Sequence, residues 1–398
     1  MLSLLAFLAV YLASVVAQQY ASAEAMIRGA MLGSIRTSWE QGTASHGLLE
    51  FDSPQFSLFG GSSFPPLPAP LSFDLSQYPV STLQLALSAV TRQAADGRLS
   101  QVIGDALDGA ALDGASAGSA VLLGSLLDPA RHDYFLNAAE AQLNYVLNVA
   151  PRMPNGAISH RAAQHEYWAD GVYMGFPFLA YYGLVTKNQT LLQTAFEQCE
   201  LYRQALFEPQ YGMWGHIYSE DTQSWSDEGI WASGNGWAAL GMLLVARTIE
   251  VSEFGQQMAN ETEALQGWVK EILVGAFANT NPDGLLPDYF FGTGVAFSDA
   301  SASGALAAAA YRCMTLWPSI FPAHTFLTPA EKIFNVIVPK VDELGLVNPV
   351  VDPLNWSSVG VVSTEAQAFG LMMSAAKRSW DQKMGLAAVA KRAKRLHH

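Results

Sequence analysis

The chain has 398 residues, of which 50% are hydrophobic and 14% are charged, a composition typical of one large or two ordinary domains with a well-packed core. The net charge of −14 argues against a nucleic-acid partner, because phosphate binding requires a basic face. It leaves acidic sugars open as ligands, since one or two local arginine or histidine side chains can bind a carboxylate.

The first 17 residues, MLSLLAFLAVYLASVVA, are apolar but too short to cross a bilayer comfortably. Small residues at 15–17 occupy the positions where a signal peptide is usually cleaved. We therefore expect a signal peptide at 1–17, a mature chain at 18–398, and a secreted, extracellular protein with no membrane partner after signal removal. Three sequons, at Asn188, Asn260 and Asn355, indicate a glycoprotein.

Six segments rich in glycine, alanine and serine recur along the chain, and each runs from polar or aromatic residues into an apolar stretch. They begin at Trp39, Asp113, Asp170, Ser233, Asp299 and Ser363. Amphipathic segments with a charged face lie between them, at 134–149, 191–206, 264–277 and 329–341. Helices of small residues can approach their neighbours closely, whereas outer helices need a polar face. The alternation predicts an all-α fold, an (α/α)6 barrel in one domain, although a linear array of hairpins would show the same pattern.

Two stretches interrupt the helical pattern. Residues 53–79 are rich in proline, glycine and serine, which indicates a long surface loop. Residues 211–226 alternate like a small β-hairpin, which we expect at one rim of the barrel. The sequence shows no alternation of strands with helices, which argues against a Rossmann or TIM architecture. The two cysteines, Cys199 and Cys313, are too few for a disulfide framework, and whether they pair stays open.

The stretch 158–182 concentrates residues that can bind or react. His160 and Arg161 precede Trp168 and Asp170, and a long apolar, helix-like run follows. An aspartate at a helix N-terminus is ordinarily a cap. Here apolar walls and several polar groups converge around it, as in a ligand pocket. The pattern therefore favours a site around Asp170.

Acids and aromatic residues recur where the inner helices are expected to begin, at one rim of the barrel. They are Trp39, Glu40, Asp113, Trp168, Asp170, Trp231, Trp237, Asp299 and Glu365. Such a ring suits a sugar, with indole faces stacking on it and acids handling protons. Glycoside hydrolysis needs paired acids, and we select Asp113 and Asp170 and interpret Asp299 and Glu365 as helix caps. No zinc-ligand spacing, GxSxG elbow or P-loop occurs, so we predict no metal and no cofactor.

Four motifs in the middle of the chain occur in the same order as in the unsaturated rhamnogalacturonyl hydrolases. They are ISHR (158–161), WADGVYMG (168–175), WGH (214–216) and WASGNGW (231–237). The chain resembles these enzymes, glycoside hydrolase family 105, and the related unsaturated glucuronyl hydrolases of family 88 over most of its length. The segment SWEQG at 38–42 is similar to the fungal members.

The resemblance implies an (α/α)6-barrel enzyme that removes a 4,5-unsaturated uronic acid from the non-reducing end of a lyase-generated oligosaccharide. An aspartic acid protonates C4 of the vinyl ether, water adds at C5, and the hemiketal opens and expels the aglycone. By position, Asp170 matches this acid and Asp113 the second carboxylate. The expected substrate-binding residues are Trp39, His160, Arg161, Trp168, Met174, His216, Trp231 and Trp237.

One departure concerns the substrate. The motif of the family commonly reads W-x-R-G-N-G-W, and its arginine can meet the acidic group of the substrate, but Ser233 stands at this position here. Either Arg161 replaces that arginine or the substrate differs. Two further interpretations stay open: a conventional inverting glycosidase that uses Asp113 and Asp170, and a catalytically silent carbohydrate-binding protein. We expect the chain to act as a monomer.

Overall fold

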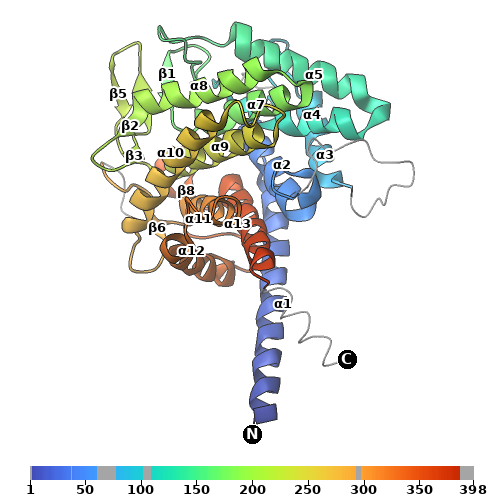
Figure 1. The fold of residues 1–398 in the computed structure, drawn as a ribbon, viewed down its shortest axis with the longest axis vertical. Helices are drawn as coiled ribbons and strands as arrows, with labels where there is room; N and C mark the ends of the chain where they lie inside the picture. The colour runs from blue at the N-terminus through green and yellow to red at the C-terminus, as the bar shows by residue number, and fades with distance from the viewer. Residues whose placement is uncertain (1, 37, 61–77, 102–108, 293–296, 386–398) are drawn as a thin grey trace.

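The computed structural model describes residues 2–36, 38–60, 78–101, 109–292 and 297–385, and it is mainly helical (Figure 1). In these residues the long helices fall into an inner and an outer set that alternate along the chain. The inner set is α2 (Ser38–Asp52), α4 (Gly118–Leu127), α7 (Phe176–Thr186), α9 (Ala232–Val251), α11 (Ala300–Leu316) and α13 (Thr364–Lys383). The outer set is α1 (Leu2–Ser34), α3 (Val80–Thr91), α5 (His132–Asn144), α8 (Gln189–Leu206), α10 (Ala259–Ala278) and α12 (Ala323–Ile337).

The inner helices form a closed ring. Helix α9 packs against α7 and α11, and α13 packs against α11 on one side and α2 on the other. The contact between α2 and α13 joins the two ends of the inner series, which a linear array of hairpins would keep apart. The prediction of an (α/α)6 barrel is therefore confirmed.

Small side chains explain why the inner helices pack so closely. Every residue of α11 from Ala300 to Met314 is buried, and α9 is buried along nearly its whole length. An outer helix instead buries one stripe. Helix α8 buries Leu192, Ala195, Cys199 and other residues three or four positions apart, and its opposite side faces solvent.

Short antiparallel strands lie at the rim of the barrel. Strands β1 (Glu166–Trp168), β4 (Ile217–Ser219) and β5 (Ser224–Asp227) form an antiparallel sheet in the order β1-β4-β5. The hairpin expected at 211–226 is thus confirmed, and β1 joins it. Antiparallel two-stranded pairs complete the rim: β2 (Phe207–Glu208) with β3 (Met213–Trp214), β6 (Leu286–Pro287) with β7 (Ser298–Asp299), and β8 (Val350–Asp352) with β9 (Asn355–Gly360).

The structure also bears on the loop, the N-terminal segment and the cysteines that the sequence singled out. The loop expected at 53–79 begins with a 3-10 turn, Pro54–Phe56, and its part at 61–77 lies outside the described residues. The C-terminal half of α1 packs into the core through Ile27 and Met31, whereas its N-terminal end extends away from the body (Figure 1). Cys199 and Cys313 are buried free thiols. Among the helices of the described residues, none combines the length and the hydropathy needed to cross a membrane.

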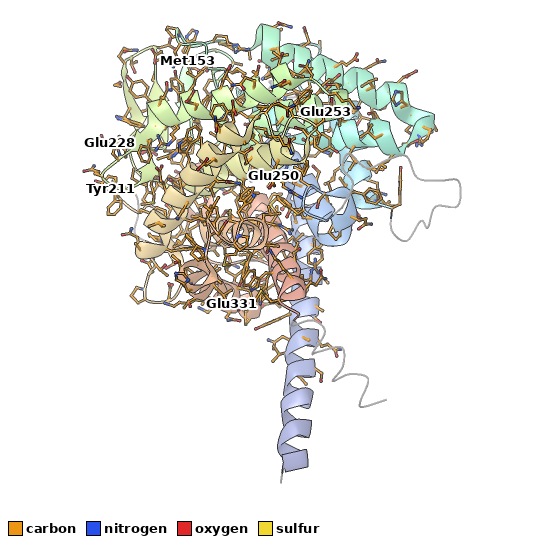
Figure 2. All side chains as sticks on the ribbon, in the orientation of Figure 1. Met153, Tyr211, Glu228, Glu250, Glu253 and Glu331 are labelled. Atoms are coloured by element: carbon orange, nitrogen blue, oxygen red, sulfur yellow. The ribbon has the colours of Figure 1, made fainter. Side chains whose placement is uncertain are left out.

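The surface carries much of the negative charge. Acidic side chains such as Glu228, Glu250 and Glu253 are exposed on the outside of the molecule (Figure 2). Charges on an exposed surface are solvated and do not by themselves mark a binding site.

The close approach of α9 and the short helix α6 (Gly171–Met174) depends on Gly241. A Cβ atom at this position would lie 2.4 Å from the carbonyl oxygen of Val172 and 2.6 Å from its carbon, so backbone would have to move. We expect Gly241→Ala to lower the free energy of unfolding by about 1–3 kcal/mol through overpacking. Thermal unfolding measures this effect.

Gly267 in α10 is the matched control, because a Cβ atom there would meet nothing within 4 Å. Gly267→Ala should raise stability by roughly 0.5–1 kcal/mol, since alanine loses less backbone entropy on folding. Equal effects of the two substitutions would contradict the packing argument.

Candidate active site

A cavity of about 240 Å³ opens where the N-terminal ends of the inner helices meet. It is lined by Trp39, Asp113, His160, Arg161, Trp168, Asp170, Met174, Trp231, Trp237, Pro353, Leu354, Trp356 and Glu365. Every residue that the sequence predicted for the site is in this set except His216. The His216 side chain is fully buried, and its Nε2 atom lies 3.4 Å from Oδ2 of Asp170.

Asp170 stands at the N-cap position of α6, but its side chain makes no capping hydrogen bond. The N–H groups of Tyr173 and Met174 donate to the backbone carbonyl oxygen of Asp170 instead. An aspartate at this position commonly stabilises a helix through its carboxylate. Here the carboxyl group is left for the cavity.

Asp113 begins a 3-10 turn (Asp113–Ala117) that leads into α4. Its Oδ1 atom lies 3.6 Å from Nε2 of His160. Burial lowers the pKa of the His160 imidazole to about 3, so this ring is neutral near pH 7. The carboxyl groups of Asp113 and Asp170 therefore border one cavity, with a neutral imidazole next to the first.

Trp168 is the centre of an aromatic cluster that forms one wall. The His160 ring stacks on its indole, with the ring centroids 5.0 Å apart, and the Arg161 guanidinium lies 5.3 Å from the centroid of the indole. Trp356 and His216 contact it edge to face. Apolar faces with a few polar groups at their edges are suited to a sugar ring.

His216 is held between two carboxyl groups. Its Nδ1 atom lies 2.8 Å from Oδ2 of Asp227, on the side opposite Asp170. Burial alone would lower the pKa of this imidazole, but the contacts with Asp170 and Asp227 outweigh it and raise the pKa above its usual value. Unlike His160, His216 therefore favours its charged form.

Glu365 lines the cavity and does not cap a helix, which corrects the sequence interpretation. The side chain of Ser363 caps α13, whereas the Glu365 carboxyl accepts a hydrogen bond from Ser301. Burial and the nearby carboxyls of Asp299 and Asp170 raise its pKa well above the usual range. Asp299, by contrast, caps α11 through the N–H groups of Ser301 and Ala302, as expected.

The polar residues of the WASGNGW motif do not line the cavity but hold together the backbone segments around it. The Asn235 side chain accepts from the Trp214 N–H and donates to the carbonyl oxygens of Trp214 and Trp231, which ties β3 to the start of α9. Ser233 is fully buried and donates to Asp299 Oδ2 at 3.0 Å. Its hydroxyl is therefore bound to the protein and does not line the cavity.

Sequence reasoning missed Trp356 and Asp227. Trp356 belongs to the β8–β9 hairpin, whose turn residues Pro353 and Leu354 also border the cavity. Asp227 ends β5, the second strand of the hairpin predicted at 211–226. Each follows the alternation of its strand, so a strand assignment at 350–360 and a check of the residue opposite Ile217, the neighbour of His216, were the signals available.

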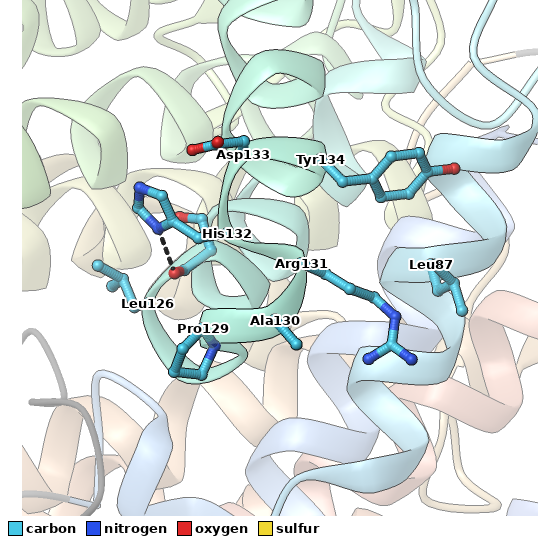
Figure 3. A pocket seen from close by; sticks show the side chains of 9 residues that line it. Leu87, Leu126, Pro129, Ala130, Arg131, His132, Asp133 and Tyr134 are labelled. Carbon is cyan, nitrogen blue, oxygen red and sulfur yellow. Dashed lines mark hydrogen bonds between the residues drawn. The ribbon is translucent and has the colours of Figure 1, made fainter.

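A larger groove of about 850 Å³ lies on the outside, between α3 and α5, and has a different character (Figure 3). Its His132 ring is hydrogen-bonded to the Ser125 carbonyl oxygen, and Arg131 forms a salt bridge with Asp128. It has no acid pair and no aromatic wall comparable with the cavity. In the part of the chain that the structure describes, no group of three or more His, Cys, Asp or Glu side chains is arranged to hold a metal ion.

Comparison with known proteins shows a family similarity over part of the chain and a shared fold. Residues 89–273 match the sequence model of Glycosyl Hydrolase Family 88. A stretch of 154 residues is 28% identical to the protein named unsaturated rhamnogalacturonyl hydrolase YesR of Bacillus subtilis (strain 168), covering 37% of this chain and 44% of that protein. The chain thus matches less than half the length of this curated relative.

Solved structures share the fold over most of both chains. A possible member of the GH105 family from Klebsiella pneumoniae subsp. pneumoniae MGH 78578 superposes with a TM-score of 0.69 at 13% identity, covering 90% of this chain and 93% of that one. The unsaturated glucuronyl hydrolase of Bacillus sp. GL1 gives a TM-score of 0.63 at 12% identity, covering 91% and 96%.

Asp288, behind the cavity, makes the stability of the fold depend on pH. Its Oδ1 atom accepts from the Trp231 indole N–H, and burial together with Asp299 raises its pKa to about 8. The unfolded chain releases this proton near pH ~4, so the wild type loses stability as pH rises from 4 to 8. Asparagine keeps the shape without titrating. We therefore expect the free energy of unfolding of Asp288→Asn, taken relative to that of the wild type, to increase by about 2–4 kcal/mol from pH 5 to pH 8.

Thermal unfolding of both proteins at the two pH values measures this difference. A gap that stays the same at pH 5 and pH 8 would mean that Asp288 is already ionised in the folded protein.

Proposed function

We propose that this chain, a member of the group formed by glycoside hydrolase families 88 and 105, removes a 4,5-unsaturated uronic acid from the non-reducing end of an oligosaccharide. One observation carries the proposal: Asp170, at the start of a helix that it does not cap, faces the same aromatic cavity as Asp113. Two carboxyl groups at one sugar-sized site can divide the work of moving protons and directing water.

The reaction requires a proton donor at carbon. The Asp170 carboxyl transfers its proton to C4, and the electron pair of the C4–C5 double bond forms the new C–H bond. Water then forms a bond to C5, and its proton returns to Asp170. The resulting hemiketal opens at C5 to a ketone, and the hemiacetal left at C1 expels the aglycone as an alcohol. Asp113 orients the water, with neutral His160 next to it.

Charge within the cavity suits an anionic substrate. Glu365 would repel a uronate if it were ionised, but burial and the nearby carboxyls of Asp299 and Asp170 raise its pKa and favour the neutral form. The Arg161 guanidinium lines the cavity, and no carboxylate among the described residues pairs with it. A Cβ atom at Gly109 would lie 2.2 Å from its Nη2 atom, so the glycine leaves room for this side chain.

We propose that Arg161 binds the carboxylate of the substrate. A guanidinium offers paired donors that match a carboxylate, and stacking near Trp168 limits its motion. Ser233 cannot serve, because its hydroxyl is bound to Asp299. The proposal resolves the missing arginine of the WASGNGW motif in favour of a replacement from another segment.

The source of the substrate and the location of the protein belong to the same proposal. We infer a pectin-derived or related lyase product and a secreted glycoprotein, on the basis of the apolar N-terminal stretch and the three sequons. Asn188, Asn260 and Asn355 are exposed, as glycan attachment requires. N-terminal sequencing of the exported protein would locate the cleavage, which we place after Ala17.

The assay for the proposed function follows the double bond itself. The wild type should consume the ultraviolet absorbance of an unsaturated uronyl disaccharide, and in D2O the product should carry deuterium at C4. Asp170→Asn should lower turnover by at least 10³-fold, in the upper part of the range for a general acid, with binding changed only a few-fold. Asp113→Asn should be severe but less complete, because it removes orientation and not the proton donor.

Each competing function predicts a different result. A conventional inverting glycosidase would release the sugar with its double bond intact. A silent binding protein would show no turnover and bind equally well after Asp170→Asn. Substantial turnover by Asp170→Asn would overturn the assigned mechanism.

Replacement of Arg161 tests how the substrate carboxylate is bound. Arg161→Met keeps an apolar stem over Trp168 and removes the charged donors, so kcat/KM should fall by about 10–100-fold, mainly through KM. A methyl-esterified substrate lacks the carboxylate and should be processed equally by both proteins. Steady-state kinetics on the acid and the ester measure both effects.

Arg152 provides the control. It lies in the same connecting segment, outside the set that lines the cavity, and its guanidinium donates to the carbonyl oxygens of Leu147 and Gly156. Arg152→Met should leave kcat/KM on the acid unchanged. If Arg161→Met impairs the acid and the ester alike, the carboxylate is bound elsewhere.

A further inference from the structure

Asp227 lies outside the cavity, and hydrogen bonds to both of its carboxyl oxygens hold its side chain in place. Its Oδ1 atom accepts from the Gly229 N–H at 2.9 Å, and its Oδ2 atom accepts from the Tyr289 hydroxyl at 2.7 Å. Strand pairing sets Asp227 opposite Ile217, the neighbour of His216. The carboxyl group thus has a defined orientation before it meets the imidazole.

Hydrogen-bond chemistry assigns the proton on Nδ1 of His216. Burial would raise the pKa of Asp227, but His216, Tyr289 and Gly229 outweigh it and hold the pKa below its usual value. An ionised carboxylate only accepts hydrogen bonds. The Nδ1 atom, 2.8 Å from Oδ2, must therefore carry a hydrogen and donate it. The ring is then oriented with Nε2 toward Asp170.

The surroundings leave two groups to set the charge of His216. The ring is enclosed by Trp231 and Trp356, with centroids 4.5 Å and 5.3 Å away. His160 and Asp288 also interact with it electrostatically, but both are neutral near pH 7, since their pKa values are about 3 and about 8. Tyr289 acts through Asp227 and stays a neutral donor, because burial and the same carboxylate raise its pKa.

We propose that Asp227 is a positioning residue that fixes His216 so that Nε2 of the imidazolium supplies the proton that Asp170 passes to the substrate. This rests on the proposed function. The Nε2 proton moves to Asp170, and from Asp170 to C4 of the sugar, while Asp227 retains the Nδ1 hydrogen. Water adds its oxygen to C5, and its released proton returns through Asp170 to Nε2. The distance of 3.4 Å between Nε2 and Oδ2 is long for a hydrogen bond, and such contacts commonly tighten when substrate is bound.

This arrangement makes a signed prediction for the pH dependence. Turnover requires the proton on Nε2 of His216, so kcat falls as pH rises through the pKa of this imidazole. Asp227→Asn removes a carboxylate that raises this pKa. The alkaline limb of the kcat profile should therefore move at least one unit toward lower pH. At neutral pH, kcat should fall by about 100-fold with KM within two-fold, because the residue does not line the cavity.

Tyr289→Phe is the matched variant with the opposite expectation. It removes a donor to Asp227 and leaves that carboxylate a stronger partner for His216, so the alkaline limb should stay or move to higher pH. Thermal unfolding of both variants excludes a loss of fold. If Asp227→Asn does not fold, the direction of the shift in Tyr289→Phe decides.

A second measurement does not depend on turnover. An NMR titration of the His216 ring should show a lower pKa in Asp227→Asn than in the wild type. Absence of wild-type turnover would remove the proposed function but leave this test of positioning intact. An unchanged His216 pKa, an unchanged alkaline limb, or a defect confined to KM would overturn the role of Asp227.

Discussion

The inner helices contact one another through small side chains, and at Gly241 the inner helix α9 meets the short helix α6 almost backbone to backbone. This contact brings six helix beginnings to one end of the barrel and leaves only a small cavity between them. The carboxyl groups of Asp113 and Asp170 owe their separation and direction to that packing. Larger residues on the inner faces would widen the ring, and the two acids would no longer share a sugar-sized site.

Burial acts differently on each titratable group around the cavity. Burial lowers the pKa of His160 although Asp170 opposes it, and it raises the pKa of Glu365, whereas the contacts of His216 with Asp170 and Asp227 outweigh burial and raise its pKa. A site that binds an anion and also stores a proton needs this division. Neutral groups avoid repulsion and unwanted ion pairs, and a single buried cation serves the acid.

Periodicity and composition were enough to predict alternating inner and outer helices, because small-residue and amphipathic helices have different patterns in any sequence. Closure into a ring was decided by the packing of α13 against α2. The motif around Asp170 likewise marked the acid and the aromatic walls. Trp356 and Asp227 could not be found in this way, since each reaches the site through a strand register that is decided by tertiary contacts. Glu365 was misinterpreted because a carboxylate near a helix start has the same sequence signature whether it caps or lines a cavity. Only the position of Ser363 two residues earlier distinguishes the two cases.

The packing of α13 against α2 has a consequence for synthesis of the chain. Glu365 and Trp356 come from the last part of the polypeptide, and the ring closes only when α13 meets a helix made near the beginning. Until then the side of α2 that α13 covers stays exposed, and the cavity lacks the residues that the last part of the chain supplies. A chain whose synthesis stops early therefore lacks α13 and has an incomplete cavity. The uncovered side of α2 is then a surface that chaperones and proteases can recognise.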